Sequence, residues 1–145
     1  VDDARAHTVL GWCDWVDGVF ATSSAHEPVL AHGDLHGHNQ VWDESAWTMR
    51  CILDLGECGA AEPEFDLRYL PDAAESVELL LDVVDAYRRA SGRALALDRV
   101  VAWHVLTNLG DALGRTEAGV DLPDGRVPRQ WVDSLDRRLH SLEVI

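Results

Sequence analysis

The stretch HGDLHGHN at residues 32–39 and the triplet DLG at residues 54–56 decide how this chain is interpreted. An apolar segment leads into the first motif, and the apolar segment CIL directly precedes the second. Asp34 and Asn39 therefore lie on one loop, and Asp54 comes fifteen residues after Asn39. A hairpin between the two motifs would bring these three side chains together.

Short β-type segments surround the two motifs. Residues 29–31 are apolar, and residues 40–42 and 49–53 carry β-forming side chains. The turn-like stretch 43–48 separates the last two segments, which predicts that they pair as a hairpin. Residues 54–71 carry two glycines and two prolines, which predicts mostly loop with a single helical turn.

Apolar residues at helical spacing predict four helices. The first covers residues 3–20. Asp72 is the expected N-cap of the second helix, because Glu75 follows three positions later as in a capping box. Gly92 is expected to end that helix, since glycine readily adopts the left-handed conformation of a helix C-terminus.

A third helix is expected to begin at Asp98, and a polar loop over residues 115–128 separates it from a fourth helix that Pro128 opens. The strands come in one block between helices, unlike the regular alternation of a doubly wound sheet. The sequence therefore predicts a single α+β domain over residues 1–145. This domain is mostly helical and holds a small β-hairpin that carries both motifs.

The charge of the chain excludes several classes of function. Twelve basic residues face 26 acidic residues, for a net charge of −14, which disfavours a nucleic-acid partner and would attract a cationic small molecule. All the basic residues are arginine, so a Walker A loop, a Schiff base and a Ser–Lys dyad are excluded.

No apolar run is long enough to cross a membrane. Three cysteines without a framework pattern favour the reducing cytoplasm.

The acidic and amide side chains of the two motifs are the set that a phosphoryl-transfer site needs. One carboxylate accepts or orients the proton of an attacking hydroxyl, and Asp34 is placed for this role. An amide oxygen and a second carboxylate hold Mg²⁺ on a nucleotide, and Asn39 and Asp54 supply them. Two protein ligands suffice because Mg²⁺ keeps several waters.

The pattern H-G-D-x-x-x-x-N followed by D-x-G resembles the catalytic and metal loops of the aminoglycoside phosphotransferase family, a branch of the protein-kinase-like fold. The resemblance covers residues 29–71. It implies that Asp34 is the catalytic base, that Asn39 and Asp54 bind Mg²⁺, and that ATP or GTP is the phosphate donor. It also implies that His32 and Asp66 support the site.

The family's nucleotide-binding N-terminal lobe, with its lysine and glycine-rich turn, has no counterpart here. Only 31 residues precede the first motif, so the chain is expected to be the C-terminal lobe of such an enzyme, inactive without the missing lobe. The resemblance implies that the intact enzyme phosphorylates a hydroxyl of a small molecule. An antibiotic of the aminoglycoside or basic peptide type is the expected acceptor.

An acidic segment follows the metal loop. Between Asp54 and Asp85 there are ten acids and one basic residue, Arg68. The first acids of this segment leave the catalytic region, so an acceptor pocket that selects a polycation is expected to be lined by Glu57, Glu62 and Glu64.

Three other interpretations stay open at this point. A domain of the same fold could bind ligands without catalysing a reaction. The sequence GDLHG at residues 33–37 also matches the opening of metallophosphoesterases, although their further metal motifs are missing. The histidines 32, 36 and 38 could belong to a zinc site, although no fourth ligand has suitable spacing.

Overall fold

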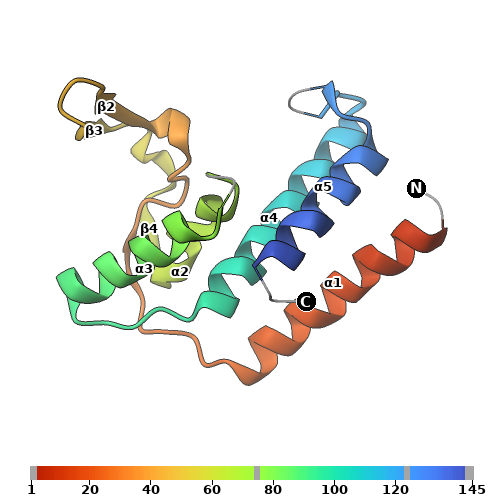
Figure 1. The fold of residues 1–145 in the computed structure, drawn as a ribbon, viewed down its shortest axis with the longest axis horizontal. Helices are drawn as coiled ribbons and strands as arrows, with labels where there is room; N and C mark the ends of the chain where they lie inside the picture. Colours follow the sequence, from red (N-terminus) through yellow and green to blue (C-terminus); the bar gives the residue numbers. More distant parts are fainter. Residues whose placement is uncertain (1–2, 74–75, 123–124, 143–145) are drawn as a thin grey trace.

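The computed structural model describes residues 3–73, 76–122 and 125–142 (Figure 1). The long helices are α1 (Asp3–Thr22), α3 (Glu78–Ser91), α4 (Leu97–Ala118) and α5 (Pro128–Ser141). The strands are β1 (Val29–Ala31), β2 (Gln40–Asp43), β3 (Thr48–Ile52) and β4 (Gly59–Ala61). Short helical segments join them: η1 (Gly37–Asn39), η2 (Leu55–Glu57), α2 (Pro63–Asp66) and η3 (Leu67–Asp72).

Helices α1, α4 and α5 lie side by side and form most of the hydrophobic core (Figure 1). The ring of Trp12 on α1 meets that of Trp131 on α5 edge-to-face, with centroids 6.5 Å apart and an interplanar angle of 80°. Aromatic pairs favour this geometry because the positive ring edge faces the negative ring face. The most deeply buried residues of this core are Trp12, Val16, Leu80, Val100, Val101, Ala102, Val105, Val132, Leu135 and Leu139.

The strands form two separate antiparallel pairs. Strands β2 and β3 pair with Gln40 opposite Ile52, which confirms the predicted hairpin. Strands β1 and β4 also pair, with Val29 opposite Ala61. The sequence predicted β4 as loop because Gly59-Ala60-Ala61 has little β propensity. Its pairing with β1 comes from the tertiary structure.

Asp43 fixes the turn of the β2–β3 hairpin. Its Oδ1 accepts hydrogen bonds from Ser45 Oγ at 2.6 Å, from Ser45 N at 3.0 Å and from Ala46 N at 3.1 Å. Its other oxygen pairs with Arg50 across the hairpin. Hydrogen bonds lower the pKa of Asp43 to about 2, and the bond from the Ser45 hydroxyl has the largest effect, with that from Arg50 second. The charged carboxylate thus closes the turn through local hydrogen bonds, as Asx turns do.

The start of α3 differs from the prediction. Asp72 is the last residue of η3 and not an N-cap, and α3 begins at Glu78. Glu75, its expected capping partner, lies outside the described residues. The predicted end is confirmed: Gly92 has φ 74°, and its N–H donates to the Arg88 carbonyl at 2.9 Å.

The bounds of the last two helices also refine the prediction. Helix α4 begins at Leu97, one residue before Asp98, and continues to Ala118. The first part of the expected polar loop at 115–128 is therefore helical. Pro128 is the first residue of α5, as predicted.

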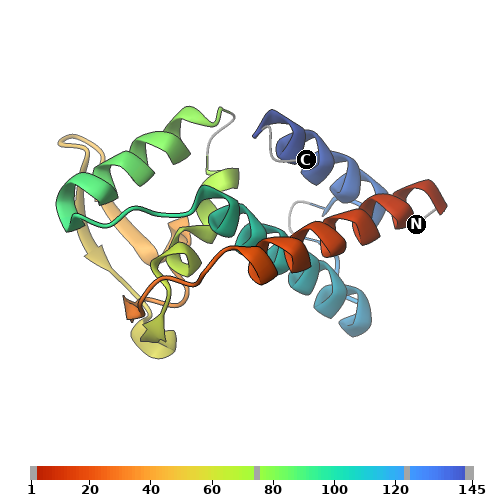
Figure 2. The ribbon, with the colours of Figure 1, turned by 90° about the horizontal axis from the view of Figure 1, so that it is seen from below.

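The fold class is α+β, mostly helical with small antiparallel sheets, as the sequence predicted. The β2–β3 hairpin and α3 lie at one end of the molecule, and α1, α5 and the end of α4 lie at the other (Figure 2). Among the described helices, none has the length and apolarity that a membrane crossing requires. The loops that carry both motifs lie on the hairpin side, and α2 and η3 connect them to α4.

Candidate active site

Asp66 at the end of α2 holds the start of the 32–39 loop. One carboxylate oxygen accepts the N–H of His32 at 2.7 Å, and the other accepts the N–H of Gly33 at 2.8 Å. Hydrogen bonds to a charged acceptor are stronger than those between neutral groups. Asp66 thus fixes the backbone of the two residues that precede Asp34.

Gly33 lets this loop contact the turn that follows Asp54. Its φ is +84°, which disfavours any side chain with a Cβ. A Cβ at this position would lie 2.3 Å from the carbonyl oxygen of Glu57. Glycine is therefore required here for both the backbone conformation and the close approach of the two loops.

His32 connects the same two segments through its ring. Its Nδ1 accepts the N–H of Asp34 at 3.2 Å, and its Nε2 lies 2.8 Å from the Leu53 carbonyl oxygen. The tautomer with the proton on Nε2 satisfies both contacts. Because both nitrogens of this buried ring are engaged, His32 is not available to bind zinc.

The Asp34 carboxylate is held from both sides. Its Oδ1 accepts the Tyr69 hydroxyl at 2.7 Å, and its Oδ2 accepts Asn39 Nδ2 at 3.2 Å. His36 Nε2 lies 3.3 Å from Oδ2, and Arg68 Nη2 lies 4.0 Å from Oδ1. About a third of the side chain remains exposed, at 31%, so a ligand can still reach the carboxylate.

Tyr69 is a hydrogen-bond donor to Asp34 over the ordinary pH range. Burial raises the pKa of Tyr69, and the hydrogen bond to the Asp34 carboxylate raises it further. The phenol therefore stays protonated and donates a hydrogen bond to Asp34. Arg68 supports this arrangement, because its Nη2 donates to the Tyr69 hydroxyl at 2.9 Å and to the Gly33 carbonyl at 2.6 Å.

Asn39 and Asp54 are suited to bind a hard cation. Asn39 Nδ2 donates to the Asp34 carbonyl at 2.8 Å as well as to its carboxylate, which leaves the amide oxygen for a metal. The Leu53 N–H donates to the Asn39 carbonyl at 2.8 Å, which places the residue before Asp54 next to Asn39. Asp54 is exposed and has φ +55°, an uncommon value for a residue other than glycine.

The donor set of this site fits Mg²⁺ better than zinc. One carboxylate and one amide oxygen are typical Mg²⁺ ligands, and water and phosphate oxygens complete the shell. Within the described part of the chain, no three His, Cys, Asp or Glu side chains are grouped to hold a metal. A zinc site at histidines 32, 36 and 38 is therefore not supported.

A cavity of about 540 Å³ opens in front of Asp34, and we call it the Asp34 cavity. Its volume falls within the roughly 300–1,000 Å³ of small-molecule sites. It lies between the 32–39 loop, η3 and α4, and its lining comprises Asp34, His36, His38, Tyr69, Asp72, His104, Thr107, Asn108, Asp111 and Arg115.

His104 forms the buried wall of this cavity. Burial lowers the pKa of His104, although the Asp72 carboxylate opposes the shift. Its Nδ1 lies 2.9 Å from the Arg68 carbonyl oxygen, so the neutral ring donates from that nitrogen. His104 thereby ties α4 to η3, next to the residue that supports Asp34 and Tyr69.

None of the three expected acceptor residues borders the Asp34 cavity, and two of them are buried elsewhere. Glu62 is buried and paired with Arg99, whose Nη2 donates at 2.6 Å, and it also accepts from Trp103. Glu64 is fully buried and accepts from His26 and from the Ala96 N–H at 2.9 Å. Both carboxylates join α2 to neighbouring segments, so the prediction for them is corrected.

Glu57, the third expected acceptor residue, lies at the end of η2 and is exposed. Its main chain faces Gly33, and its side chain is not part of the Asp34 cavity. The acids that do line the cavity beside Asp34 are Asp72 and Asp111.

The sequence missed Tyr69, Asp72 and Asp111 as site residues. Tyr69 lies three residues after Asp66, which the motif resemblance already marked as a residue that supports the site. This closeness in sequence was the only indication that Tyr69 belongs to the site. The sequence predicts Asp72 as a helix N-cap, and no motif around Asp111 distinguishes it from other acids on a helix surface. Contacts between η3 and the 32–39 loop bring Tyr69 to Asp34, and the packing of α4 against η3 brings Asp111 to the same cavity.

Comparisons with known proteins give one family. A family model described as the phosphotransferase enzyme family, APH, matches residues 3–104. A solved structure, the crystal structure of an aminoglycoside-3'-phosphotransferase of type VIII, is similar with 16% sequence identity and a TM-score of 0.48. The similarity covers 70% of this chain and 49% of that one, so this chain spans about half its length. No curated protein matches the chain.

The family match confirms the resemblance that the two motifs indicated. The matched range includes the 32–39 loop, the 54–56 triplet, α2 and η3. Since the matched residues make up most of the sequence, the chain belongs to the phosphotransferase enzyme family, APH.

Proposed function

We propose that this chain is the catalytic and acceptor-binding lobe of a small-molecule kinase. The intact enzyme would transfer the γ-phosphoryl group of ATP or GTP to a hydroxyl of an antibiotic or related small molecule. The observation that carries the proposal is the Asp34 carboxylate, which is held by Tyr69 and Asn39 and faces a cavity of about 540 Å³.

Asp34 would orient the acceptor hydroxyl and take its proton. The acceptor oxygen would then bond to the γ-phosphorus while the bond between that phosphorus and the nucleoside diphosphate breaks. Phosphoryl transfer has a loose transition state, so positioning accounts for most of the catalysis. The fixed orientation of the carboxylate through Tyr69 and Asn39 supports this role.

Asn39 and Asp54 would hold Mg²⁺ on the nucleotide, and the ion would neutralise charge on the transferring phosphoryl group. The free amide oxygen of Asn39 and the exposed carboxylate of Asp54 support this assignment. The nucleotide would also need an N-terminal lobe. Exposed apolar side chains on the hairpin, among them Trp47 at 82%, would be available to pack against such a lobe.

The acceptor is proposed to carry positive charge. The carboxylates of Asp34, Asp72 and Asp111 line the Asp34 cavity, whereas its one arginine, Arg115, is paired with Asp111 at 2.9 Å. Amino groups of an aminoglycoside or a basic peptide antibiotic would be attracted to such a lining. A cytoplasmic location is proposed from the three cysteines, none of which forms a disulfide.

The test is the effect of Asp34→Asn on the intact enzyme, measured as release of nucleoside diphosphate with a panel of cationic and neutral hydroxylated compounds. We expect kcat to fall by about 10²–10⁴-fold, the range for loss of a general base, with a smaller change in nucleotide affinity. Asp82→Asn on α3 removes the same charge from an exposed position and should leave kcat unchanged.

Three results would count against this proposal. Turnover that survives Asp34→Asn would remove Asp34 from the chemistry. Ligand binding without diphosphate release by any wild-type reaction would favour a silent binding domain. Preference for neutral compounds, with no effect of salt on the cationic ones, would rule out the acidic acceptor site.

A further inference from the structure

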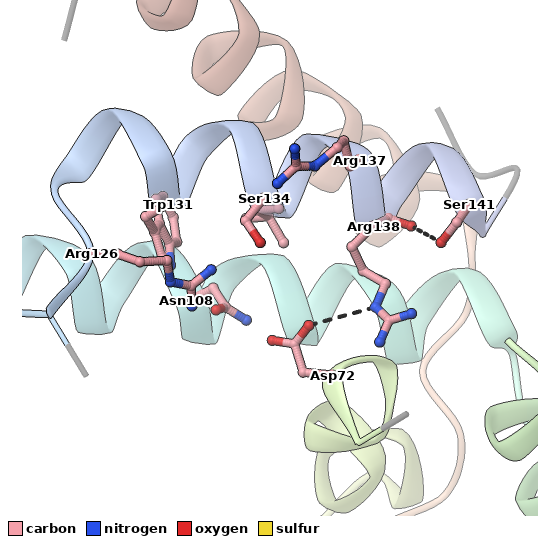
Figure 3. Close-up of a pocket in the computed structure, with 9 residues that line it drawn as sticks. Asp72, Asn108, Arg126, Trp131, Ser134, Arg137, Arg138 and Ser141 are labelled. Carbon is pink, nitrogen blue, oxygen red and sulfur yellow. Dashed lines mark hydrogen bonds and ion pairs between the residues drawn. The ribbon is translucent and has the colours of Figure 1, made fainter. Parts of the chain in front are cut away.

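A second cavity lies beside the Asp34 cavity, between α4 and α5 (Figure 3). It has a volume of about 630 Å³, and we call it the arginine cavity. Trp131 forms an apolar part of its wall, and polar residues surround it: Arg126, Arg137, Arg138, Ser134 and Ser141.

The charge of the arginine cavity is opposite to that of the whole chain. The chain has a net charge of −14 and only twelve basic residues, yet three of them line this one cavity. Among the described residues that line it, the one acid is Asp72. Guanidinium groups bind carboxylates and phosphates through paired N–H donors, so this lining selects an oxyanion.

The volume of the cavity leaves room for such a ligand. The Nε of Arg138 lies 3.7 Å from Asp72 Oδ1, an ion pair at the edge of the cavity. Arg137 is exposed and makes no ion pair with any described residue. Ser134 and Arg137 project from adjacent turns of α5 (Figure 3).

The two cavities meet at Asp72 and Asn108, which line both of them. Asp72 faces each cavity with one oxygen. Its Oδ1 faces Arg138 of the arginine cavity, and its Oδ2 lies 3.6 Å from His104 Nε2 of the Asp34 cavity. A single elongated molecule could therefore occupy both cavities.

We propose that the arginine cavity binds an oxyanion, a carboxylate or a phosphate, carried by the molecule that Asp34 phosphorylates. This inference rests on the proposed function and narrows its acceptor to a compound with an amino end and an anionic end. The donor nucleotide is not the source of the anion, because neither Asn39 nor Asp54 lines the arginine cavity.

The first experiment titrates the chain with inorganic phosphate, without Mg²⁺ or nucleotide, and follows the NMR signals of the Trp131 indole and the arginine side chains. We expect binding that Arg137→Gln weakens by about tenfold, the effect of losing one charge-assisted hydrogen bond. The matched control is Arg129→Gln, which removes the same charge from an exposed position of α5 outside the cavity and should change affinity less than about twofold.

Absence of phosphate binding at Trp131 would overturn the inference. Equal weakening by Arg137→Gln and Arg129→Gln would overturn it too, since net charge alone would then explain the affinity. Asp34→Asn should leave phosphate binding intact. This variant separates the two proposals, because it should greatly reduce phosphotransfer while phosphate binding in the arginine cavity persists. The phosphate titration can therefore succeed even if the phosphotransfer proposal fails.

The second experiment distinguishes an acceptor arm from a separate anion site. The probes are a peptide that contains serine and lysine with a free C-terminal carboxylate, and the same peptide as its C-terminal amide. We expect the carboxylate form to displace phosphate and the amide form to do so much less. Equal behaviour of the two forms, or simultaneous binding of phosphate and the carboxylate form, would overturn the acceptor-arm assignment.

Discussion

Asp66→Asn should destabilise the 32–39 loop, although Asp66 does not line the Asp34 cavity. The carboxylate accepts two main-chain hydrogen bonds, from His32 at 2.7 Å and from Gly33 at 2.8 Å. The asparagine side chain has one oxygen and one amino group, so it can accept only one of these N–H groups. The other N–H would face a second donor and lose its partner.

The magnitude follows from these two contacts. Hydrogen bonds to a charged group contribute about 1.5–3 kcal/mol each, and a neutral replacement contributes about 1 kcal/mol. Two lost bonds of about 2 kcal/mol and one regained bond of about 1 kcal/mol give a net loss of about 3 kcal/mol. Since domains of this size unfold with about 5–15 kcal/mol, the loss is a large part of the total.

Urea unfolding of the wild type and Asp66→Asn measures this loss, and hydrogen exchange reports the His32 and Gly33 amides directly. Both amides should exchange faster in the variant. Asp82→Asn on the exposed part of α3 is the control for the charge change and should cost less than about 0.5 kcal/mol. If Asp66→Asn is as stable as this control, with unchanged exchange, Asp66 does not hold the loop.

Gly33→Ala should lower the free energy of unfolding by more than about 2 kcal/mol in urea titrations, because φ is +84° and a Cβ would lie 2.3 Å from the Glu57 carbonyl. Gly110→Ala, inside α4 with nothing within 4 Å, should instead raise it by about 0.5–1 kcal/mol, and a loss there would contradict the argument. Burial lowers the pKa of His104 below its unfolded value of 6.5, so its contribution to stability is present above pH 6.5 and lost as pH falls through the folded pKa. Urea unfolding from pH 7.5 to 5.5 should show this loss, and His104→Gln should make the profile flatter; an unchanged profile would assign the acid sensitivity to other groups.

The sequence alone predicted the chemistry of the two motifs, because that chemistry depends on residues that lie close together along the chain. Asp34 and Asn39 lie on one loop, and the 40–53 hairpin that returns the chain to Asp54 is specified by its own alternation and turn. Gly92 and Pro128 marked helix bounds for the same reason, since each acts through its own backbone conformation.

Packing decided which acids line the Asp34 cavity. Glu62 and Glu64 are close to the motifs in sequence, yet they are buried against Arg99 and His26. An acid in a short acidic segment looks the same whether it faces solvent, a pocket or a buried arginine, because burial depends on which helix packs against it.

The tertiary structure alone assembled the two cavities. Tyr69 meets Asp34 across 35 residues of sequence, and Asp111 joins the same cavity from the middle of α4. The arginine cavity likewise depends on Asp72 of η3 meeting Arg138 of α5. The sequence fixes which donors and acceptors each segment carries, but long-range contacts between helices set their distances and orientation, and these contacts leave no local periodicity to detect.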